Sequence, residues 1–115
     1  MTRVISVHEY ILRPDVKEVD FENAVQEASR RGLLQFAGLD EYHFVRGIRG
    51  TQSGCYGTIW IYESKEAWEM LWGSVEKPLS RVDYPEKWKV WEQEVLAPFL
   101  EDAPDKIRFT AYEEY

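Results

Sequence analysis

The stretch from Tyr56 to Trp72, YGTIWIYESKEAWEMLW, constrains the fold most, because the spacing of its large side chains changes once. Up to Tyr62 the aromatic residues fall at even positions, which is typical of a β-strand with two different faces. After Ser64 the spacing becomes helical, with Trp68 followed by Trp72 on one face. Serine is also a residue type that commonly begins a helix. The stretch therefore predicts a strand that leads directly into a helix.

Periodicity places the other elements in the same way. β-Branched and aromatic residues predict strands at 3–12, 39–50, 55–63 and 107–115. Apolar residues at helical spacing predict helices at 19–32, 64–79 and 80–99, the last with Pro85 near its start. The order β-α-β-β-α-α-β is the ferredoxin-like pattern with one added helix. We expect an α+β fold with a four-stranded antiparallel sheet, order 4-1-3-2, and helices on one face.

Composition limits the partners. A chain of 115 residues with 44 % hydrophobic residues suits a single domain over 1–115. The net charge of −7 disfavours nucleic acid and anionic membrane surfaces, which both attract basic proteins. One cysteine allows no intramolecular disulfide, and no apolar run is long enough to span a bilayer. We expect a cytoplasmic protein.

Alternation along the strands separates two faces of the predicted sheet. One face carries small aliphatic side chains such as Ile5, Val7, Ile59 and Ile61, and we expect it beneath the helices. The other is aromatic with hydroxyl and basic groups, and we expect it to be free of helices and covered by a second copy of the sheet, a ligand or both. The candidate pocket residues on this face are His8, Tyr10, Tyr42, Phe44, Arg46, Trp60, Tyr62, Arg108 and Tyr112.

His8 is the candidate general base, because a histidine pKa near neutrality suits abstraction of a phenol or enol proton. The alternative is a histidine buried in a dimer interface. Trp60 and Tyr62 could stack on a flat ligand, or pack across a dimer. Arg46 or Arg108 could bind an anion, or pair with nearby glutamates.

The sequence predicts no metal site and no cofactor. The two histidines of the chain, His8 and His43, are expected on opposite faces of the sheet, and a metal site usually needs three or more ligands. The helical tryptophans have a structural explanation, because their spacing places them in the core between helices and sheet. They are Trp68, Trp72, Trp88 and Trp91.

The element order, ILRPDVKEVDFENAV (11–25) and IYESKEAWEMLW (61–72) together resemble the dimeric α/β-barrel superfamily, and within it the antibiotic-biosynthesis-monooxygenase-like (ABM-like) proteins. The resemblance implies a homodimer with a pocket beside the sheet. Its members include cofactor-free oxygenases, haem-degrading enzymes and isomerases. The haem-degrading branch calls for an asparagine on the first strand and a late histidine, whereas this chain has Ser6 and His8 and no histidine after His43. The oxygenase branch matches at Trp60 and Tyr62.

The expected function is therefore binding of a small ligand, with a cofactor-independent oxygenase or isomerase reaction on an aromatic or enolisable compound. One alternative is a non-catalytic homodimer whose sheet face is filled by its own side chains. Another is a regulatory or assembly module.

Overall fold

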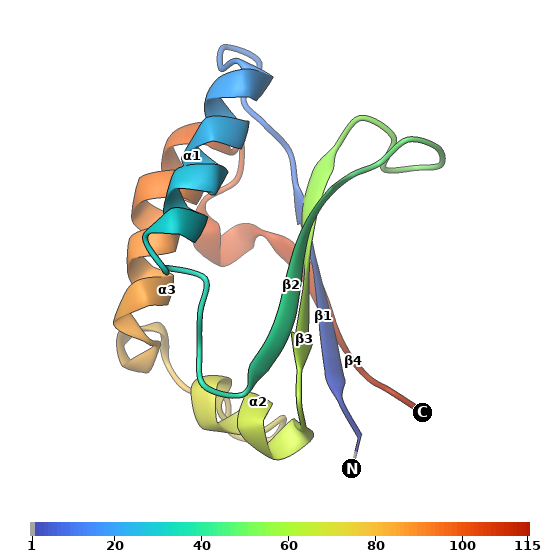
Figure 1. Cartoon of the computed structure of the whole chain (residues 1–115), viewed down its shortest axis with the longest axis vertical. Helices are drawn as coiled ribbons and strands as arrows, with labels where there is room; N and C mark the ends of the chain where they lie inside the picture. The colour runs from blue at the N-terminus through green and yellow to red at the C-terminus, as the bar shows by residue number, and fades with distance from the viewer. Residues whose placement is uncertain (1) are drawn as a thin grey trace.

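The computed structural model describes residues 2–115 as one antiparallel sheet with helices on one side (Figure 1). The strand order is β2-β3-β1-β4, which is the predicted order read from the other edge, so the ferredoxin-like α+β prediction is confirmed. Helices α1 and α3 lie over one face, and α2 lies at the end of the sheet. The strands and α-helices are β1 (Val4–Tyr10), α1 (Glu18–Arg30), β2 (Leu39–Arg46), β3 (Tyr56–Tyr62), α2 (Lys65–Trp72), α3 (Glu86–Trp91), α4 (Ala97–Phe99) and β4 (Arg108–Glu113).

The predicted and observed boundaries of the elements differ mainly in the second half of the chain. Ser64 caps α2 as predicted, because its Oγ accepts a hydrogen bond from the Ala67 amide at 3.1 Å. Helix α2 ends at Trp72, not at residue 79, because Gly73 adopts a left-handed φ of 87°. A short 3₁₀ helix (Arg81–Asp83) and an extended stretch then precede α3.

Helix α3 continues into a π-helical segment (Glu92–Leu96) before α4. Here the Ala97 amide donates to the carbonyl of Glu92, five residues earlier, which defines the wider π turn. The proline at position 98 has no N–H for the regular ladder, which is consistent with a local change of helix type. The wider turn alters which side chains point towards the sheet, and such segments often lie at functional sites.

The helices cover the aromatic face of the sheet, so the prediction that they cover the aliphatic face is wrong. Trp60 and Tyr10 are fully buried beneath them. The Tyr10 ring lies 6.3 Å from Phe21 of α1, and the Trp60 ring lies 6.4 Å from Trp91 of α3. The helices themselves contribute large rings, and together with the rings of the sheet they fill the layer between helices and sheet.

The opposite face of the sheet, called the open face below, carries Ile5, Val7, Ile59 and Ile61. These residues form cross-strand pairs between the two central strands, Ile5 with Ile61 and Val7 with Ile59. All four are partly exposed, although they are aliphatic. The open face is therefore the surface that a partner could cover.

The register of the edge strands assigns the remaining residues to faces. On β2, Tyr42 pairs with Trp60, so its grouping with the aromatic face is confirmed, whereas His43 pairs with Ile59 on the open face. On β4, Phe109 lies opposite His8. Arg108 and Tyr112 therefore lie on the open face, and their predicted place on the His8 face is wrong.

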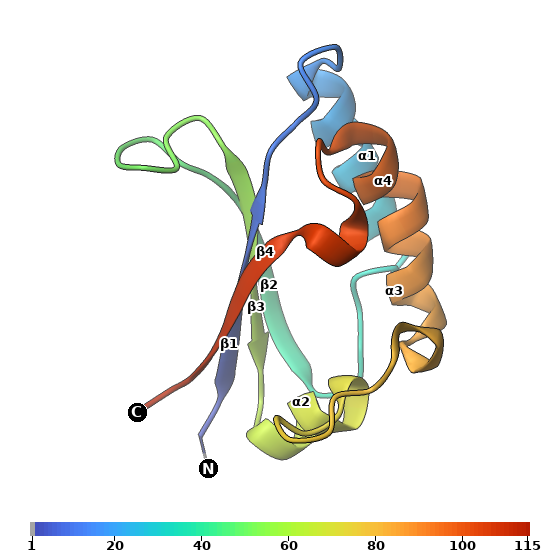
Figure 2. The same ribbon diagram turned by 180° about the vertical axis from the view of Figure 1, so that it is seen from behind.

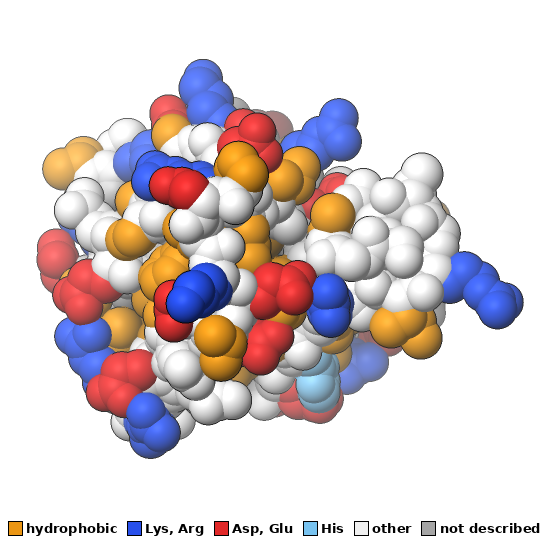
Figure 3. All heavy atoms as spheres, turned by 90° about the horizontal axis from the view of Figure 1, so that it is seen from above, with side chains coloured by type: hydrophobic (Ala, Val, Ile, Leu, Met, Phe, Trp, Pro, Cys, Tyr) orange, Lys and Arg blue, Asp and Glu red, His pale blue; other side chains and the backbone are white. Residues whose placement is uncertain are grey.

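The loop between β2 and β3 projects away from the body of the molecule, and both termini lie at the far end (Figure 2). Seen from above, acidic and basic side chains are intermixed over the helical body (Figure 3). Within residues 2–115, no helix has the length and apolar character needed to cross a membrane.

Candidate functional site

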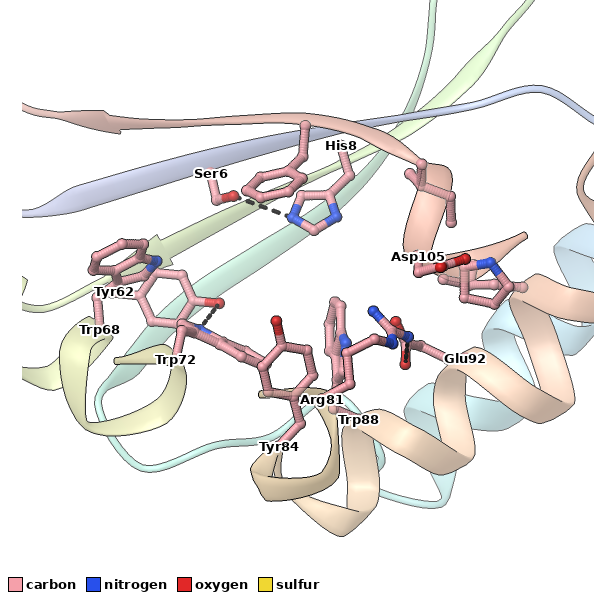
Figure 4. A pocket seen from close by; sticks show the side chains of 14 residues that line it. Ser6, His8, Tyr62, Trp68, Trp72, Arg81, Tyr84, Trp88, Glu92 and Asp105 are labelled. Carbon is pink, nitrogen blue, oxygen red and sulfur yellow. Dashed lines mark hydrogen bonds and ion pairs between the residues drawn. The ribbon is translucent and has the colours of Figure 1, made fainter. Parts of the chain in front are cut away.

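A pocket of about 300 Å³ lies between the sheet and the helices on the side of β4 (Figure 4). Its lining comes from β1, β3 and β4 on one side, and from α2, the 3₁₀ helix, α3 and the π-helical segment on the other. Its volume is at the small end of the range for ligand sites. The lining residues are Ser6, His8, Tyr62, Trp68, Trp72, Arg81, Tyr84, Trp88, Glu92, Leu96, Pro104, Asp105, Ile107 and Phe109.

His8 projects from the centre of β1 into this pocket. Its Nε2 lies 3.1 Å from the Oγ of Ser6, which is buried two residues earlier on the same face. Its ring lies 5.8 Å from Trp88 and 5.3 Å from Phe109. Burial among these rings lowers the pKa of His8 to about 4, so the imidazole is neutral at physiological pH. A neutral imidazole can accept a proton or a hydrogen bond from a ligand.

The opposite wall is a corner of three aromatic rings, Trp72, Tyr84 and Trp88. The Trp72 ring lies 5.2 Å from Tyr84 at 88° and 5.1 Å from Trp88 at 70°, so each pair meets edge to face. The indole N–H of Trp72 donates to the Tyr62 hydroxyl at 3.2 Å, which fixes the orientation of its ring. Burial raises the pKa of Tyr62, so its phenol remains protonated.

Three charged side chains line the pocket. The Arg81 guanidinium donates to the carboxylate of Glu92 and lies 5.6 Å above the Tyr84 ring. The Glu92 side chain is only 9 % exposed, whereas that of Arg81 is 45 % exposed. Asp105, an exposed residue, also lines the pocket, and no side-chain hydrogen bond or ion pair to it occurs among the described residues. With His8 neutral, two carboxylates against one guanidinium leave the pocket with one net negative charge.

Of the residues singled out in the sequence, His8 and Tyr62 meet at this pocket. Trp60 lies behind His8, with its ring 6.0 Å away, and donates its N–H to Thr58 at 2.8 Å. Tyr10 is buried deeper and shares a 2.7 Å hydrogen bond with the same threonine. Burial raises the pKa of Tyr10.

The other candidates lie further from the pocket. Tyr42 shares a 2.6 Å hydrogen bond with Ser29 of α1, and the ring of Phe44 lies 5.6 Å from Phe21. The remaining three occupy surface positions: Arg46 pairs with Glu18 of α1 at 3.0 Å, and Arg108 and Tyr112 are exposed on the open face.

Sequence reasoning missed the pocket residues of the second half, and assigned Trp68, Trp72 and Trp88 to the core alone. Arg81 and Asp105 lie in 3₁₀ helices of three residues each (Arg81–Asp83 and Pro104–Lys106), which are too short to show a periodic pattern in the sequence. Glu92, in contrast, had a visible signal, because a carboxylate one turn after Trp88 interrupts the apolar stripe of this helix. No cluster of three potential metal-binding side chains occurs among residues 2–115.

Comparison with known proteins shows likeness in structure alone. No known protein family and no curated protein sequence matches the chain. A DABB family protein with a ferredoxin-like fold from Mesorhizobium loti is 12 % identical, with a TM-score of 0.65, over 97 % of this chain and 96 % of that one. A Bordetella bronchiseptica protein named after the antibiotic biosynthesis monooxygenases is 14 % identical, with a TM-score of 0.66, over 100 % of this chain and 99 % of that one.

A third similar structure is a dimeric protein of unknown function and ferredoxin-like fold from Bacteroides fragilis. It is 13 % identical, with a TM-score of 0.61, over 96 % of this chain and 95 % of that one. These likenesses extend over almost the whole chain, and they confirm the ferredoxin-like fold that the element order predicted.

Proposed function

We propose that the protein binds a small aromatic or enolisable compound in the His8 pocket. The observation that carries the proposal is a cavity of about 300 Å³ with aromatic rings on two walls and a neutral imidazole between them. Such a space suits a planar ring, which gains stacking contacts from the walls and can donate a hydrogen bond to His8.

Catalysis forms the second part of the proposal: a cofactor-independent oxygenase or isomerase reaction in which His8 takes a proton from the bound phenol or enol. If Nε2–H donates to Ser6, Nδ1 holds the lone pair that a base requires. The lowered pKa of His8 makes it a weak base. Proton transfer therefore depends on the bound ligand stabilising the imidazolium that forms.

Strand β4 offers a matched pair of variants for testing the binding site. Phe109 lines the pocket and is 60 % exposed, whereas Tyr112 is 55 % exposed and lies on the open face. A panel of planar phenols and enols is titrated by calorimetry against both alanine variants. Phe109→Ala should weaken binding by about tenfold through lost ring contact, and Tyr112→Ala should leave it unchanged. Equal effects of the two substitutions would place the ligand elsewhere.

Turnover is tested separately from binding. His8→Gln keeps a polar side chain but removes the base, so it should abolish oxygen uptake or isomerisation of any compound that wild type converts, while binding persists. Wild-type rates in His8→Gln would remove His8 from the reaction and leave the binding proposal intact.

The partner in this proposal is a second copy of the chain, paired through the open face. The exposed aliphatic cluster around Ile5 and Ile61 supports it, as does the description of several similar structures as dimeric. Ile61→Arg should convert a dimer into a monomer in sedimentation at micromolar concentration. Val82→Arg, at a 73 % exposed position in the 3₁₀ helix, is the control and should stay dimeric. Monomeric wild type would refute this part.

A further inference from the structure

We propose that the pocket selects a positively charged ligand, an aromatic ammonium or guanidinium compound, which replaces Arg81 at Glu92. The inference rests on the proposed function, because it concerns the same pocket and specifies the charge of its ligand. Three features support it. The Arg81 guanidinium is bound between Glu92 and Tyr84, the Glu92 side chain is buried, and the Asp105 carboxylate at the pocket has no cationic partner within residues 2–115.

The Arg81 guanidinium already occupies a cation site. It is held by the Glu92 carboxylate on one side and lies 5.6 Å from the centre of the Tyr84 ring on the other. A carboxylate combined with an aromatic ring face is the environment in which proteins bind organic cations. The perpendicular rings of Trp72 and Trp88 extend this environment into the cavity.

Glu92 and Arg81 differ in how firmly the fold holds them. Glu92 lies on the helical layer with its side chain 9 % exposed, so it cannot turn to water without moving the helix. Arg81 lies on a three-residue 3₁₀ helix in an exposed connection, with its side chain 45 % exposed. The guanidinium can therefore leave for solvent while the carboxylate stays, which opens a place for another cation.

The remaining charges disfavour an anion. Asp105 lines the pocket without a partner among the described residues, and His8 is neutral, so a bound carboxylate would face two carboxylates and only one cation. The chain as a whole carries a net charge of −7, which also repels anionic ligands at long range. A cation that replaces Arg81 at Glu92 restores the positive charge that leaves with the guanidinium, whereas an anion makes the pocket more negative.

Three probes of similar size test the charge at neutral pH: phenethylamine, which is a cation, 2-phenylethanol, which is neutral, and 3-phenylpropionate, which is an anion. Calorimetric titration of wild type should show phenethylamine binding about tenfold more tightly than either of the others. Glu92→Gln should abolish this preference.

Arg81→Ala gives predictions of opposite sign for the two charge classes. If Arg81 competes with the ligand for Glu92, its removal should tighten phenethylamine binding several-fold. If Arg81 instead anchors an anion, its removal should weaken phenylpropionate binding and leave phenethylamine unchanged, which would overturn the inference. Arg30→Ala, which removes a surface guanidinium paired with Glu27 on α1, is the control for net charge.

Two further outcomes bear on the inference. Equal affinity for the three probes would overturn charge selection, yet it would leave the pocket as a binding site for aromatic compounds. Failure of all three to bind would also overturn it, and the wider panel of phenols and enols tested with Phe109→Ala would then decide the proposed function by itself.

Discussion

Replacement of Thr58 by valine tests the burial of the aromatic face within one protomer. Thr58 lies at the centre of β3, and its side chain is fully buried. Its Oγ1 accepts the indole N–H of Trp60 at 2.8 Å and shares a 2.7 Å hydrogen bond with the Tyr10 hydroxyl. Valine has nearly the same shape, so the substitution removes the hydroxyl without opening a cavity.

The expected loss of stability follows from the two groups that lose their hydrogen-bond partner, the indole N–H of Trp60 and the hydroxyl of Tyr10. A buried donor or acceptor left unpaired costs about 1–3 kcal/mol, so the loss of partners at Trp60 and Tyr10 should lower the free energy of unfolding by about 2–6 kcal/mol. At about 4 °C per kcal/mol for a domain of this size, the melting temperature should fall by about 8–24 °C. Urea unfolding followed by tryptophan fluorescence measures the first quantity, and calorimetry the second.

Two variants control this experiment. Thr110→Val makes the same chemical change at an exposed position of β4 on the open face, and it should alter stability by less than about 0.5 kcal/mol. Tyr10→Phe in the Thr58→Val background removes one of the two unpaired groups and should recover about 1 kcal/mol. Thr58→Val stability equal to that of Thr110→Val would show that the hydroxyl is not buried as described, and the reasoning would fail.

Two other predictions concern pH and backbone geometry. Because burial lowers the pKa of His8 from 6.5 to about 4, the unfolded chain binds a proton that the folded chain does not, so stability should fall by up to about 3 kcal/mol as the pH drops from 6.5 to 4. Urea unfolding across this range should show a flatter profile for His8→Gln, and an unchanged profile would contradict the assignment. Gly38 has a φ of 87°, and an added Cβ would lie 2.5 Å from the Cβ of Ala67, so Gly38→Ala combines strain with a clash. It should lower the unfolding midpoint clearly more than Gly50→Ala, where φ is 103° and no atom lies within 4 Å; equal losses would refute the clash.

Side-chain alternation could be predicted from the sequence because a strand has a fixed period of two. The grouping of Tyr42 with Trp60, and of His8 with Tyr10, therefore held in the structure. The pairing of β4 with β1 was less accessible, because its residues were assigned to faces by side-chain type. Arg108 and Tyr112 were expected on the His8 face, yet the hydrogen-bonded register places Phe109 opposite His8 and Tyr112 opposite Ile5.

The choice of which face the helices cover could not be made from strand composition, because both faces of the central strands are apolar. The chirality of the crossover fixes the side of the sheet on which α1 lies. The positions at which β1 ends and β2 begins decide whether the odd-numbered or the even-numbered side chains point to that side. The local sequence does not determine these positions. The large rings of the helices, such as Phe21 and Trp91, were a usable sign, because they indicate a thick aromatic layer that the small aliphatic face would fill poorly.

The observed assignment of faces separates the two proposed activities of the molecule. A partner copy would cover the aliphatic side of the sheet, whereas the ligand pocket lies between the other side and the helices. Neither proposal therefore needs the other to be correct, unlike the sequence-based picture in which one aromatic face served both. They share the backbones of β1, β3 and β4, and on β4, for example, Phe109 points to the pocket and Tyr112 to the open face. An effect of dimer formation on ligand binding, if measured, should therefore pass through the backbones of these three strands and depend on their pairing.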